Sequence, residues 1–257
     1  MKPSAPSWSL WIDIARPGWA NMAIDQTLLE RAAAGERWLR LYGWNPFCLS
    51  FGRNEPATRR YDADRIESLG LDVVRRPTGG RAVWHGHELT YTVACPVELM
   101  TLRESYLEIH RMLRDALRSL GVPAELASPR RAVGVGAGAC FAQPAGGEIM
   151  VKGRKVIGSA QLRQNGALLQ HGSILLGDDQ RMVGAVTRGA VPDDLGAPLQ
   201  AILRSNLESA ELVEAVSRAA AARWTGAWTT IDSADEIVET STRHMARFRS
   251  PEWTWSA

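Results

Sequence analysis

The chain has 257 residues, 45% of them hydrophobic, so it is long and apolar enough to bury a full core. Its 30 Lys and Arg residues nearly balance its 28 Asp and Glu residues, and the net charge of +2 excludes the broad basic field that drives binding to nucleic acids or membranes. Three cysteines without metal-ligand spacing predict free thiols in a reducing compartment. The sequence shows no apolar signal segment and no run near the roughly 18 residues that span a bilayer, so we expect a cytoplasmic protein with neither a nucleic-acid nor a membrane partner.

The first half of the chain predicts an amphipathic strand, two helices and several short strands. An alternation of apolar and mostly polar residues near the N-terminus has the period of a half-buried strand. The apolar positions are Trp8, Leu10, Ile12 and Ile14, and the pair Pro17-Gly18 ends the strand. The next predicted elements are a helix at 21–35, strands at 37–42 and 47–51, a helix near 62–69, and strands at 71–76, 81–85 and 88–95. Cys95 shares a face with the apolar residues of the last strand, so we interpret it as a core residue.

The second half predicts a long helix, an antiparallel hairpin and two further helices. Thr101 and Glu104 have the spacing of a capping box at the start of an amphipathic helix. The apolar stripe of this helix comprises Leu102, Tyr106, Ile109, Leu113, Ala116, Leu117 and Leu120. Strands are expected at 148–152, 155–164 and 167–176, with Asn165-Gly166 as a type I′ turn and Lys155 on the middle strand. Helical patterns recur near 208–223 and 233–247, with a short strand near 227–232.

These elements predict one mixed fold without internal repeats. The fold class is α/β, in the sense of a mixed α+β sheet, within a single domain over residues 1–257. A core at about 8–231 precedes a C-terminal helical segment at 232–257.

A glycine-rich turn follows the predicted strand at 71–76, within the run RRPTGGRAVWH at 75–85. Two adjacent glycines allow backbone N–H groups to approach an anionic or carbonyl ligand, and the flanking arginines are suited to a phosphate. A Gly-Gly hairpin turn with solvated arginines is the alternative interpretation. The spacing matches neither a Walker loop nor a dinucleotide-binding fingerprint.

A cysteine and a lysine lie close together in the second half of the sequence. Only three of the 30 basic residues are lysines, and Lys155 follows Cys140 of the stretch GVGAGAC by fifteen residues. An amine exchanges a proton, which a guanidinium does not, and a nearby ammonium stabilises a thiolate. The pair therefore indicates nucleophilic acyl transfer. A surface hairpin with an unrelated core cysteine is the alternative.

Histidines near strand ends complete the candidate chemistry. His171 lies in the run QHGS, and His85 and His87 precede it. None has the setting of a metal ligand, so we expect no metal and give the histidines supporting roles. Ser-His-Asp hydrolysis is a poor fit because the sequence has no G-x-S-x-G elbow.

A family resemblance joins these motifs. The runs NMAIDQTLLE, LRLYGW, LSFGRNE, VRRPTGGRAVWHGHELTYTV, ACF, VKGRKVIGSAQLRQNGALLQHGSILL and SPEW resemble the biotin/lipoate protein ligase superfamily over most of the chain. Among its members the chain is most similar to the cysteine-dependent octanoyltransferases of the LipM type. The resemblance implies the catalytic-domain fold of these ligases, in which the glycine-rich motif and the lysine strand clasp an acyl group.

The resemblance also implies roles for individual residues. Cys140 matches the cysteine that accepts the acyl group, and Lys155 matches the lysine that lowers the pKa of that cysteine. The residues that match the substrate-clasping motif and the facing strands are Arg76, Thr78, Gly79, Gly80, Arg81, His85, Gly158, Ser159, Ala160 and His171. The chain departs from the family after the cysteine, where Gly146-Gly147 precedes Glu148 in place of a proline-serine pair and an aromatic residue, and this implies a more mobile cysteine loop.

The implied activity is transfer of an octanoyl group from acyl carrier protein to a lysine of a lipoyl-domain protein, with the glycine cleavage H protein as the preferred acceptor. The donor thioester already supplies the activation, so no cofactor, ATP or metal is required. An ATP-dependent lipoate-protein ligase is the alternative, opposed by Cys140 and by a length that leaves little room for an extra domain. A third reading is a non-catalytic protein that binds acyl carrier or lipoyl domains, which retention of both Cys140 and Lys155 opposes.

Overall fold

The computed structural model describes residues 6–97, 100–128, 147–189, 196–204 and 206–256. The strands are β1 (Ser7–Ile12), β2 (Trp38–Tyr42), β3 (Cys48–Phe51), β4 (Asp72–Arg75), β5 (Val83–His85), β6 (Glu88–Pro96), β7 (Ala124–Leu126), β8 (Ile149–Val151), β9 (Arg154–Lys155), β10 (Ile157–Gln164), β11 (Ala167–Leu175) and β12 (Ala227–Thr230). The helices are α1 (Gly18–Ala33), α2 (Ala57–Arg60), α3 (Ala63–Ser68), α4 (Leu102–Ser119), α5 (Arg181–Val186), α6 (Leu199–Leu203), α7 (Ser209–Arg223), α8 (Asp235–Arg249) and α9 (Pro251–Thr254).

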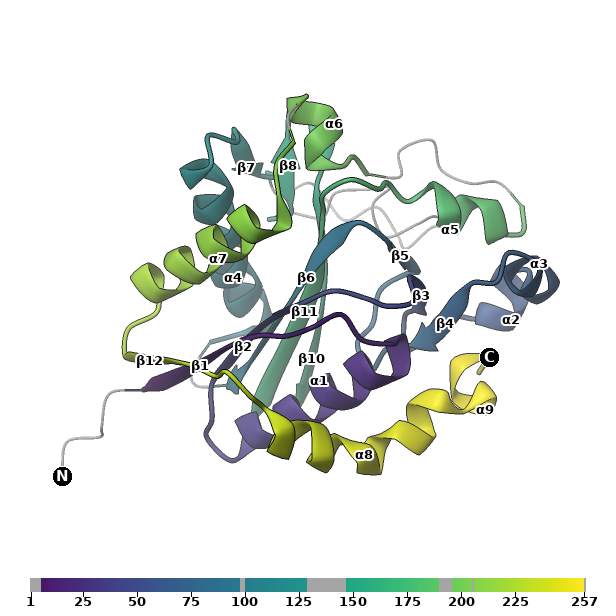
Figure 1. The fold of residues 1–257 in the computed structure, drawn as a ribbon, viewed down its shortest axis with the longest axis horizontal. Helices are drawn as coiled ribbons and strands as arrows, with labels where there is room; N and C mark the ends of the chain where they lie inside the picture. Colours follow the sequence, from purple (N-terminus) through teal and green to yellow (C-terminus); the bar gives the residue numbers. More distant parts are fainter. Residues whose placement is uncertain (1–5, 98–99, 129–146, 190–195, 205, 257) are drawn as a thin grey trace.

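A six-stranded mixed sheet organises the fold, with strand order β10-β11-β6-β2-β1-β12. The pairs from β10 to β2 are antiparallel, whereas β1 pairs in parallel with both β2 and β12. Helices cover both faces: α1 and α8 lie on one side of the sheet, and α4 and α7 lie on the other (Figure 1). The α/β class with a mixed sheet, predicted from the sequence, is therefore confirmed.

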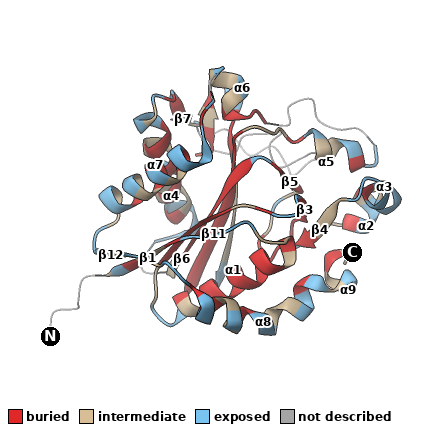
Figure 2. Cartoon of the chain, viewed as in Figure 1, coloured by how far each residue is buried: buried red, intermediate tan, exposed pale blue. Residues whose placement is uncertain are grey.

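Burial follows this layered arrangement. Every residue of β2 is buried, and Figure 2 shows buried residues concentrated on the sheet and on the inward sides of the helices. One cluster joins the sheet to α4 and α7 through residues such as Leu113 and Val216, and a second joins it to α1 and α8 through residues such as Leu28 and Ile237. Both faces of the central strands are thus shielded from water, which stabilises the fold by about 25 cal/mol for each Å² of apolar surface buried.

Two smaller sheets flank the large one. In the first, β3 pairs in parallel with β4 and in antiparallel fashion with β5, and in the second β8 pairs with β7 and β9. The predicted hairpin between β10 and β11 is confirmed: the strands are antiparallel, and Asn165 and Gly166 both have the positive φ that a type I′ turn requires. No helix in the described part of the chain is long and apolar enough to cross a membrane.

The N-terminal strand differs from its predicted pattern. Ile12 and Ile14 are 52% and 68% exposed, whereas Trp11 is buried between the sheet and α1. The predicted single buried face is wrong because helices cover both faces of β1 near Trp8 and Trp11, and the strand ends at Ile12.

Lys155 also lies elsewhere than predicted. It belongs to the two-residue strand β9, which pairs with β8 in a small sheet, and not to the middle strand β10 of the hairpin. The chain passes from one sheet to the other at Val156, whose N–H donates to the Ile149 carbonyl. This crossing places Lys155 at the junction between two sheets. The alternation of apolar and polar residues along the sequence does not show where one strand ends and the next begins.

The capping box at Thr101 and Glu104 is confirmed at the start of α4. The apolar stripe is buried at Ile109, Leu113, Ala116 and Leu117, whereas Leu120 is partly buried and Leu102 is 42% exposed. The remaining short helices, α2, α5, α6 and α9, were not predicted because four to six residues are too few to show a helical period.

Candidate functional site

A pocket opens between the glycine-rich turn, β6, β10 and β11. Its walls combine large apolar groups with buried polar ones and with residues of the two hairpin strands. The lining residues are Met22, Tyr42, Trp44, Ser50, Arg76, Val83, His85, Thr90, Gly158, Ala160, His171, Gly172 and Ser173. Five of the residues predicted to bind substrate thus line one pocket: Arg76, His85, Gly158, Ala160 and His171.

Arg76 holds the glycine-rich turn from inside. Its guanidinium donates to the carbonyls of Gly79 at 2.9 Å and Arg81 at 2.6 Å, and to the carbonyl of Ser50 at 2.9 Å. The side chain is 4% exposed, so these bonds form away from water. Arg76 therefore shapes the turn, rather than standing in solvent as the alternative hairpin interpretation would have it.

Thr78 anchors the first half of the turn to the large sheet. Its hydroxyl lies 2.6 Å from His171 Nε2, and His171 Nδ1 lies 2.8 Å from Asp25 of α1. Burial lowers the pKa of His171, and the hydrogen bond to Asp25 opposes that shift. The Asp25 carboxylate also accepts from Arg40 Nη1 at 3.0 Å, and both of these side chains are fully buried. A buried, charge-compensated network thus ends at the turn.

His85 anchors the far end of the same motif. Its Nε2 lies 2.7 Å from Ser50 Oγ, and its Nδ1 lies 2.8 Å from Glu88. The Trp44 ring stacks on the imidazole, with centroids 3.9 Å apart. The imidazole is thus fixed on both edges and on one face, so its geometry is that of a rigid pocket wall.

Two glycines permit a close backbone approach beside the pocket. A Cβ on Gly52 would lie 1.9 Å from the Gly80 carbonyl oxygen, and Gly80 has a φ of 91°. Only glycine fits both positions. The Gly79-Gly80 pair therefore lets the turn pack against the end of β3, and it leaves Gly80 exposed at the surface.

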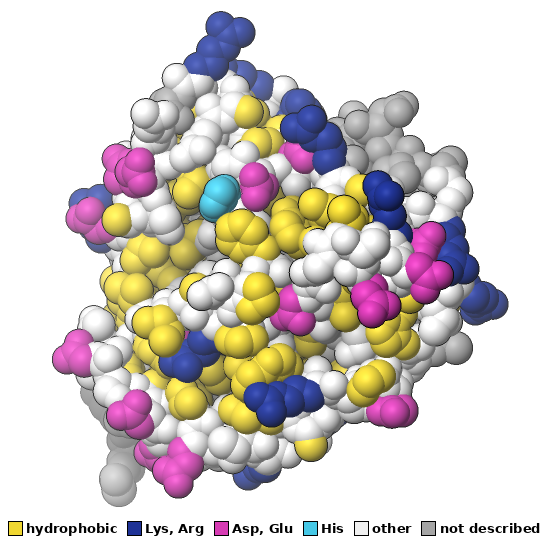
Figure 3. All heavy atoms as spheres, turned by 45° about the vertical axis from the view of Figure 1, so that its right-hand side comes forward, with side chains coloured by type: hydrophobic (Ala, Val, Ile, Leu, Met, Phe, Trp, Pro, Cys, Tyr) yellow, Lys and Arg dark blue, Asp and Glu magenta, His cyan; other side chains and the backbone are white. Residues whose placement is uncertain are grey.

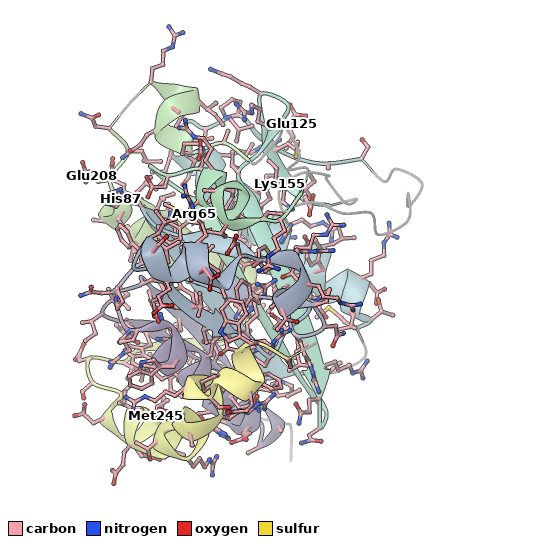
Figure 4. The ribbon with its side chains drawn as sticks, turned by 90° about the vertical axis from the view of Figure 1, so that its right-hand side faces the viewer. Arg65, His87, Glu125, Lys155, Glu208 and Met245 are labelled. Carbon is pink, nitrogen blue, oxygen red and sulfur yellow. The ribbon has the colours of Figure 1, made fainter. Side chains whose placement is uncertain are left out.

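Lys155 is buried and ion-paired. The side chain is 1% exposed, and its Nζ lies 2.5 Å from Glu148 Oε1, whose side chain is 8% exposed. Figure 4 places Lys155 in the upper half of the molecule, below Glu125 of β7. Lys152 contrasts with it: that residue is exposed and donates to the Ile202 carbonyl at 3.2 Å. The chain therefore buries the one lysine for which the sequence predicts chemistry.

Ser159 lies on β10 between Gly158 and Ala160, which line the pocket, but its side chain forms hydrogen bonds with Tyr91 and His110, which do not. Its hydroxyl contacts Tyr91 Oη at 2.7 Å and His110 Nε2 at 2.9 Å. The other five residues predicted to bind substrate do not line the pocket: Thr78, Gly79, Gly80, Arg81 and Ser159.

Cys140 lies outside the described residues. The other two cysteines are described: Cys48 is fully buried in β3, and Cys95 is partly buried at the end of β6 against the main cluster. Burial raises the pKa of the Cys48 thiol well above its ordinary value, which makes this thiol a poor nucleophile.

Several polar residues that build the site were not predicted from the sequence: Asp25, Ser50, Glu88, His110 and Glu148. Asp25 lies among buried residues of α1 that include polar Asn21, and His110 interrupts the apolar face of α4; polar residues at such positions are a signal for a buried network. Ser50, Glu88 and Glu148 carry no comparable signal, because their partners come from other elements.

The face turned forward in Figure 3 shows Lys and Arg interspersed with Asp and Glu around hydrophobic side chains. This face carries no field of one sign, in agreement with the small net charge.

Residues 17–220 match the family model of the lipoyl protein ligase A/B catalytic domain, and the chain belongs to that family. Octanoyltransferase LipM of Symbiobacterium thermophilum is 41% identical over 222 residues, which cover 82% of this chain and 80% of that protein. Octanoyltransferase LipM of Kyrpidia tusciae is 36% identical and covers 91% of this chain and 93% of its own length.

Solved structures agree with the fold. A lipoate-protein ligase A bound with ATP superposes with a TM-score of 0.82 at 20% identity and covers 97% of this chain and 98% of its own. A bi-partite lipoate protein ligase from Thermoplasma acidophilum gives a TM-score of 0.79 at 18% identity, with 97% and 96% covered. The predicted ligase catalytic-domain fold is confirmed. Because the first of these ligase chains matches the present chain from end to end, length alone does not separate a transferase from a ligase.

Proposed function

We propose that the protein is an octanoyltransferase of lipoate biosynthesis, and that it works through a thioester on Cys140. The observation that carries the proposal is the relationship to octanoyltransferases of 36% to 41% identity, which extends over most of the chain. The buried Lys155 supports it, because an enclosed amine beside a carboxylate is suited to accept and return protons.

The reaction has two acyl transfers. The Cys140 thiolate attacks the carbonyl carbon of octanoyl-phosphopantetheine, a new C–S bond forms, and the pantetheine sulfur leaves and takes a proton. The amine of an acceptor lysine then attacks the Cys140 thioester, an amide forms, and the Cys140 sulfur leaves. Lys155 holds the proton of Cys140 during the first transfer and exchanges protons with the leaving and attacking groups. No ATP enters this scheme, because the donor thioester is already activated.

The pocket described above is proposed to receive the octanoyl chain. The acyl tail packs against the apolar groups of Met22, Tyr42 and Trp44. The donor is octanoyl-acyl carrier protein, and the acceptor is a lipoyl-domain protein such as the glycine cleavage H protein.

Intact mass spectrometry tests the proposal directly. The purified protein is incubated with octanoyl-acyl carrier protein, and we expect a stable gain of one octanoyl group. Cys140→Ser should abolish this gain and all transfer to a lipoyl domain, because a serine hydroxyl forms no thioester and is a far weaker nucleophile. Cys95→Ala is the matched control and should be acylated like the parent protein.

The same assay separates the transferase from the alternatives. Transfer by Cys140→Ser at the parent rate would contradict the covalent mechanism. ATP-dependent pyrophosphate release with free octanoate or lipoate, without acylation of Cys140, would make the protein a ligase. Binding of both carrier proteins with no modification of either would make it a non-catalytic binding protein.

A further inference from the structure

His110 of α4 connects the lysine side of the site to the pocket wall. The imidazole is fully buried, and the Tyr106 ring packs on it with centroids 3.9 Å apart. Its Nδ1 lies 2.8 Å from the Gly147 carbonyl oxygen, and its Nε2 lies 2.9 Å from Ser159 Oγ. One side chain thus joins the residue just before Glu148 to the strand β10 that lines the pocket.

These contacts define the proton positions of a hydrogen-bond chain. A carbonyl oxygen only accepts, so His110 Nδ1 carries the proton and Nε2 of the neutral ring accepts from the Ser159 hydroxyl. Ser159 Oγ in turn accepts from Tyr91, and Tyr91 Oη accepts from Gln170 Nε2 at 2.8 Å. Burial raises the pKa of Tyr91, so its hydroxyl keeps the proton that this chain requires. Every donor therefore points toward Gly147.

The imidazole stays neutral because of where it lies. Burial lowers the pKa of His110 to about 3, the bond to the Gly147 carbonyl opposes that shift, and the positive charge of Lys155 adds to it.

The backbone on either side of Glu148 is held at several points. Gly147 N–H donates to the Ala127 carbonyl at 2.8 Å, and the Glu148 carbonyl accepts from Ala127 N–H at 2.7 Å. His110 lies on α4, in a different layer of the fold, and it adds a hydrogen bond to the Gly147 carbonyl. The carboxylate that contacts Lys155 is thereby fixed relative to the pocket wall.

We propose that Glu148 is a positioning residue for the Lys155 amine, and that His110 keeps Glu148 in register with the pocket through the Gly147 carbonyl. The inference rests on the proposed function. It assigns Glu148 the task of orienting the amine and of stabilising its charge while Lys155 carries the proton taken from the thiol. His110 exchanges no proton in the reaction.

Four variants test this division of roles. Glu148→Gln keeps the size of the side chain and removes its charge, and we expect kcat for octanoyl transfer to fall about 10- to 100-fold with KM for the donor little changed. His110→Phe keeps a buried ring without either bond and should lower kcat about 10-fold. His110→Asn retains a donor at the Nδ1 position and should recover most of that loss. Met112→Leu, a buried residue on the same helix, is the control and should leave kcat unchanged.

A double-mutant cycle identifies the route of the effect. If His110 acts through Glu148, the protein with both Glu148→Gln and His110→Phe should be no slower than Glu148→Gln alone, within about threefold. Effects that multiply would overturn the inference, as would His110→Phe at the parent kcat. All rates are taken per folded molecule, so that a loss of stability does not count as a loss of positioning.

Nitrogen-15 NMR supplies a readout without catalysis. The chain has three lysines, so the Lys155 ammonium signal is readily assigned, and it should be sharp in the parent protein and in His110→Asn but broadened in His110→Phe. The His110 ring should be neutral with its proton on Nδ1 at pH 7 and at pH 5. The Nε2–H tautomer, or a Lys155 signal unaffected by His110→Phe, would contradict the inference even if transfer is confirmed. Absence of acylation in the parent protein would instead contradict the proposed function.

Discussion

The glycine-rich turn and the Lys155 corner, two regions for which the sequence predicts function, are held in different ways. The turn at 77–82 is fixed by Arg76 from inside, by the buried Asp25 network through Thr78, and by close packing against Gly52. The Lys155 side chain forms a buried ion pair with Glu148, and hydrogen bonds from Ala127 and His110 hold the backbone at Gly147 and Glu148.

Because the two regions are held differently, substitutions in them should differ in how far they lower stability and how far they lower transfer activity. A turn anchored to a buried charge network is coupled to the stability of the whole fold, because removal of the Asp25 charge leaves the buried Arg40 guanidinium less compensated, with Asp13 as its remaining ion-pair partner in the network. The Lys155–Glu148 pair is buried as well, but its proposed role is chemical, so substitutions there should lower transfer per folded molecule in addition to costing stability.

The largest effect is expected at Lys155. Lys155→Arg and Lys155→Ala should both lower octanoyl transfer about 10²- to 10⁴-fold, because a guanidinium keeps the charge but does not exchange protons. Lys152→Arg is the control. Because the Lys152 side chain is exposed, this variant should transfer octanoate at the parent rate. Single-turnover transfer to a lipoyl domain is the measurement. A parent rate in Lys155→Arg would reduce the lysine to an electrostatic partner.

Asp25→Asn should break the anchor of the turn. The carboxylate accepts from Arg40, Thr92 and His171, and the amide would place a donor against these donors while Arg40 stays charged. We expect a loss of about 3–5 kcal/mol in the free energy of unfolding, measured by urea titration. Glu214→Gln is the matched control, since its pair with Arg218 is exposed on α7 and is worth roughly 0.5 kcal/mol or less. Equal losses in the two variants would refute the proposed anchoring.

Gly52→Ala should displace the turn by steric contact alone. The new Cβ would lie 1.9 Å from the Gly80 carbonyl oxygen, so the backbone must shift, at an expected cost of about 1–3 kcal/mol together with weaker binding of the acyl donor. In Gly43→Ala the nearest atom would be Ala15 Cβ at 3.5 Å, an ordinary contact, and stability should change little. Neither glycine has a positive φ, so the comparison isolates packing. Thermal unfolding and donor KM of Gly52→Ala that match those of Gly43→Ala would disprove the close approach.

The smallest effect is the pH dependence of stability that His110 contributes. Its pKa is lowered to about 3 in the folded state from 6.5, so between these values the unfolded chain binds more protons and stability falls as pH falls. From pH 7 to pH 5 the contribution amounts to roughly 1–2 kcal/mol. His110→Phe should flatten this part of the stability curve, while the shift at His171, which has the same direction, persists. A slope that does not change would show that His110 is not buried in its neutral form.

The sequence by itself determined the local elements and the chemistry to look for. Amphipathic period, the Thr101 capping box and the Asn-Gly turn depend on neighbouring residues, and the structure confirms the capping box and the hairpin. Family motifs named Arg76, His85, Gly158, Ala160 and His171, and these residues line one pocket. The roles of Cys140 and Lys155 stay predictions.

Only the tertiary structure decided which side chains support that chemistry. Glu148 meets Lys155 because β8 and β9 pair, and His110 reaches Gly147 because α4 packs against the small sheet. Ile12 is exposed, although it belongs to an alternating pattern, because its surroundings depend on which helices cover β1. Such contacts join residues far apart in the chain, and a periodicity reports which face of an element is apolar but not what that face meets.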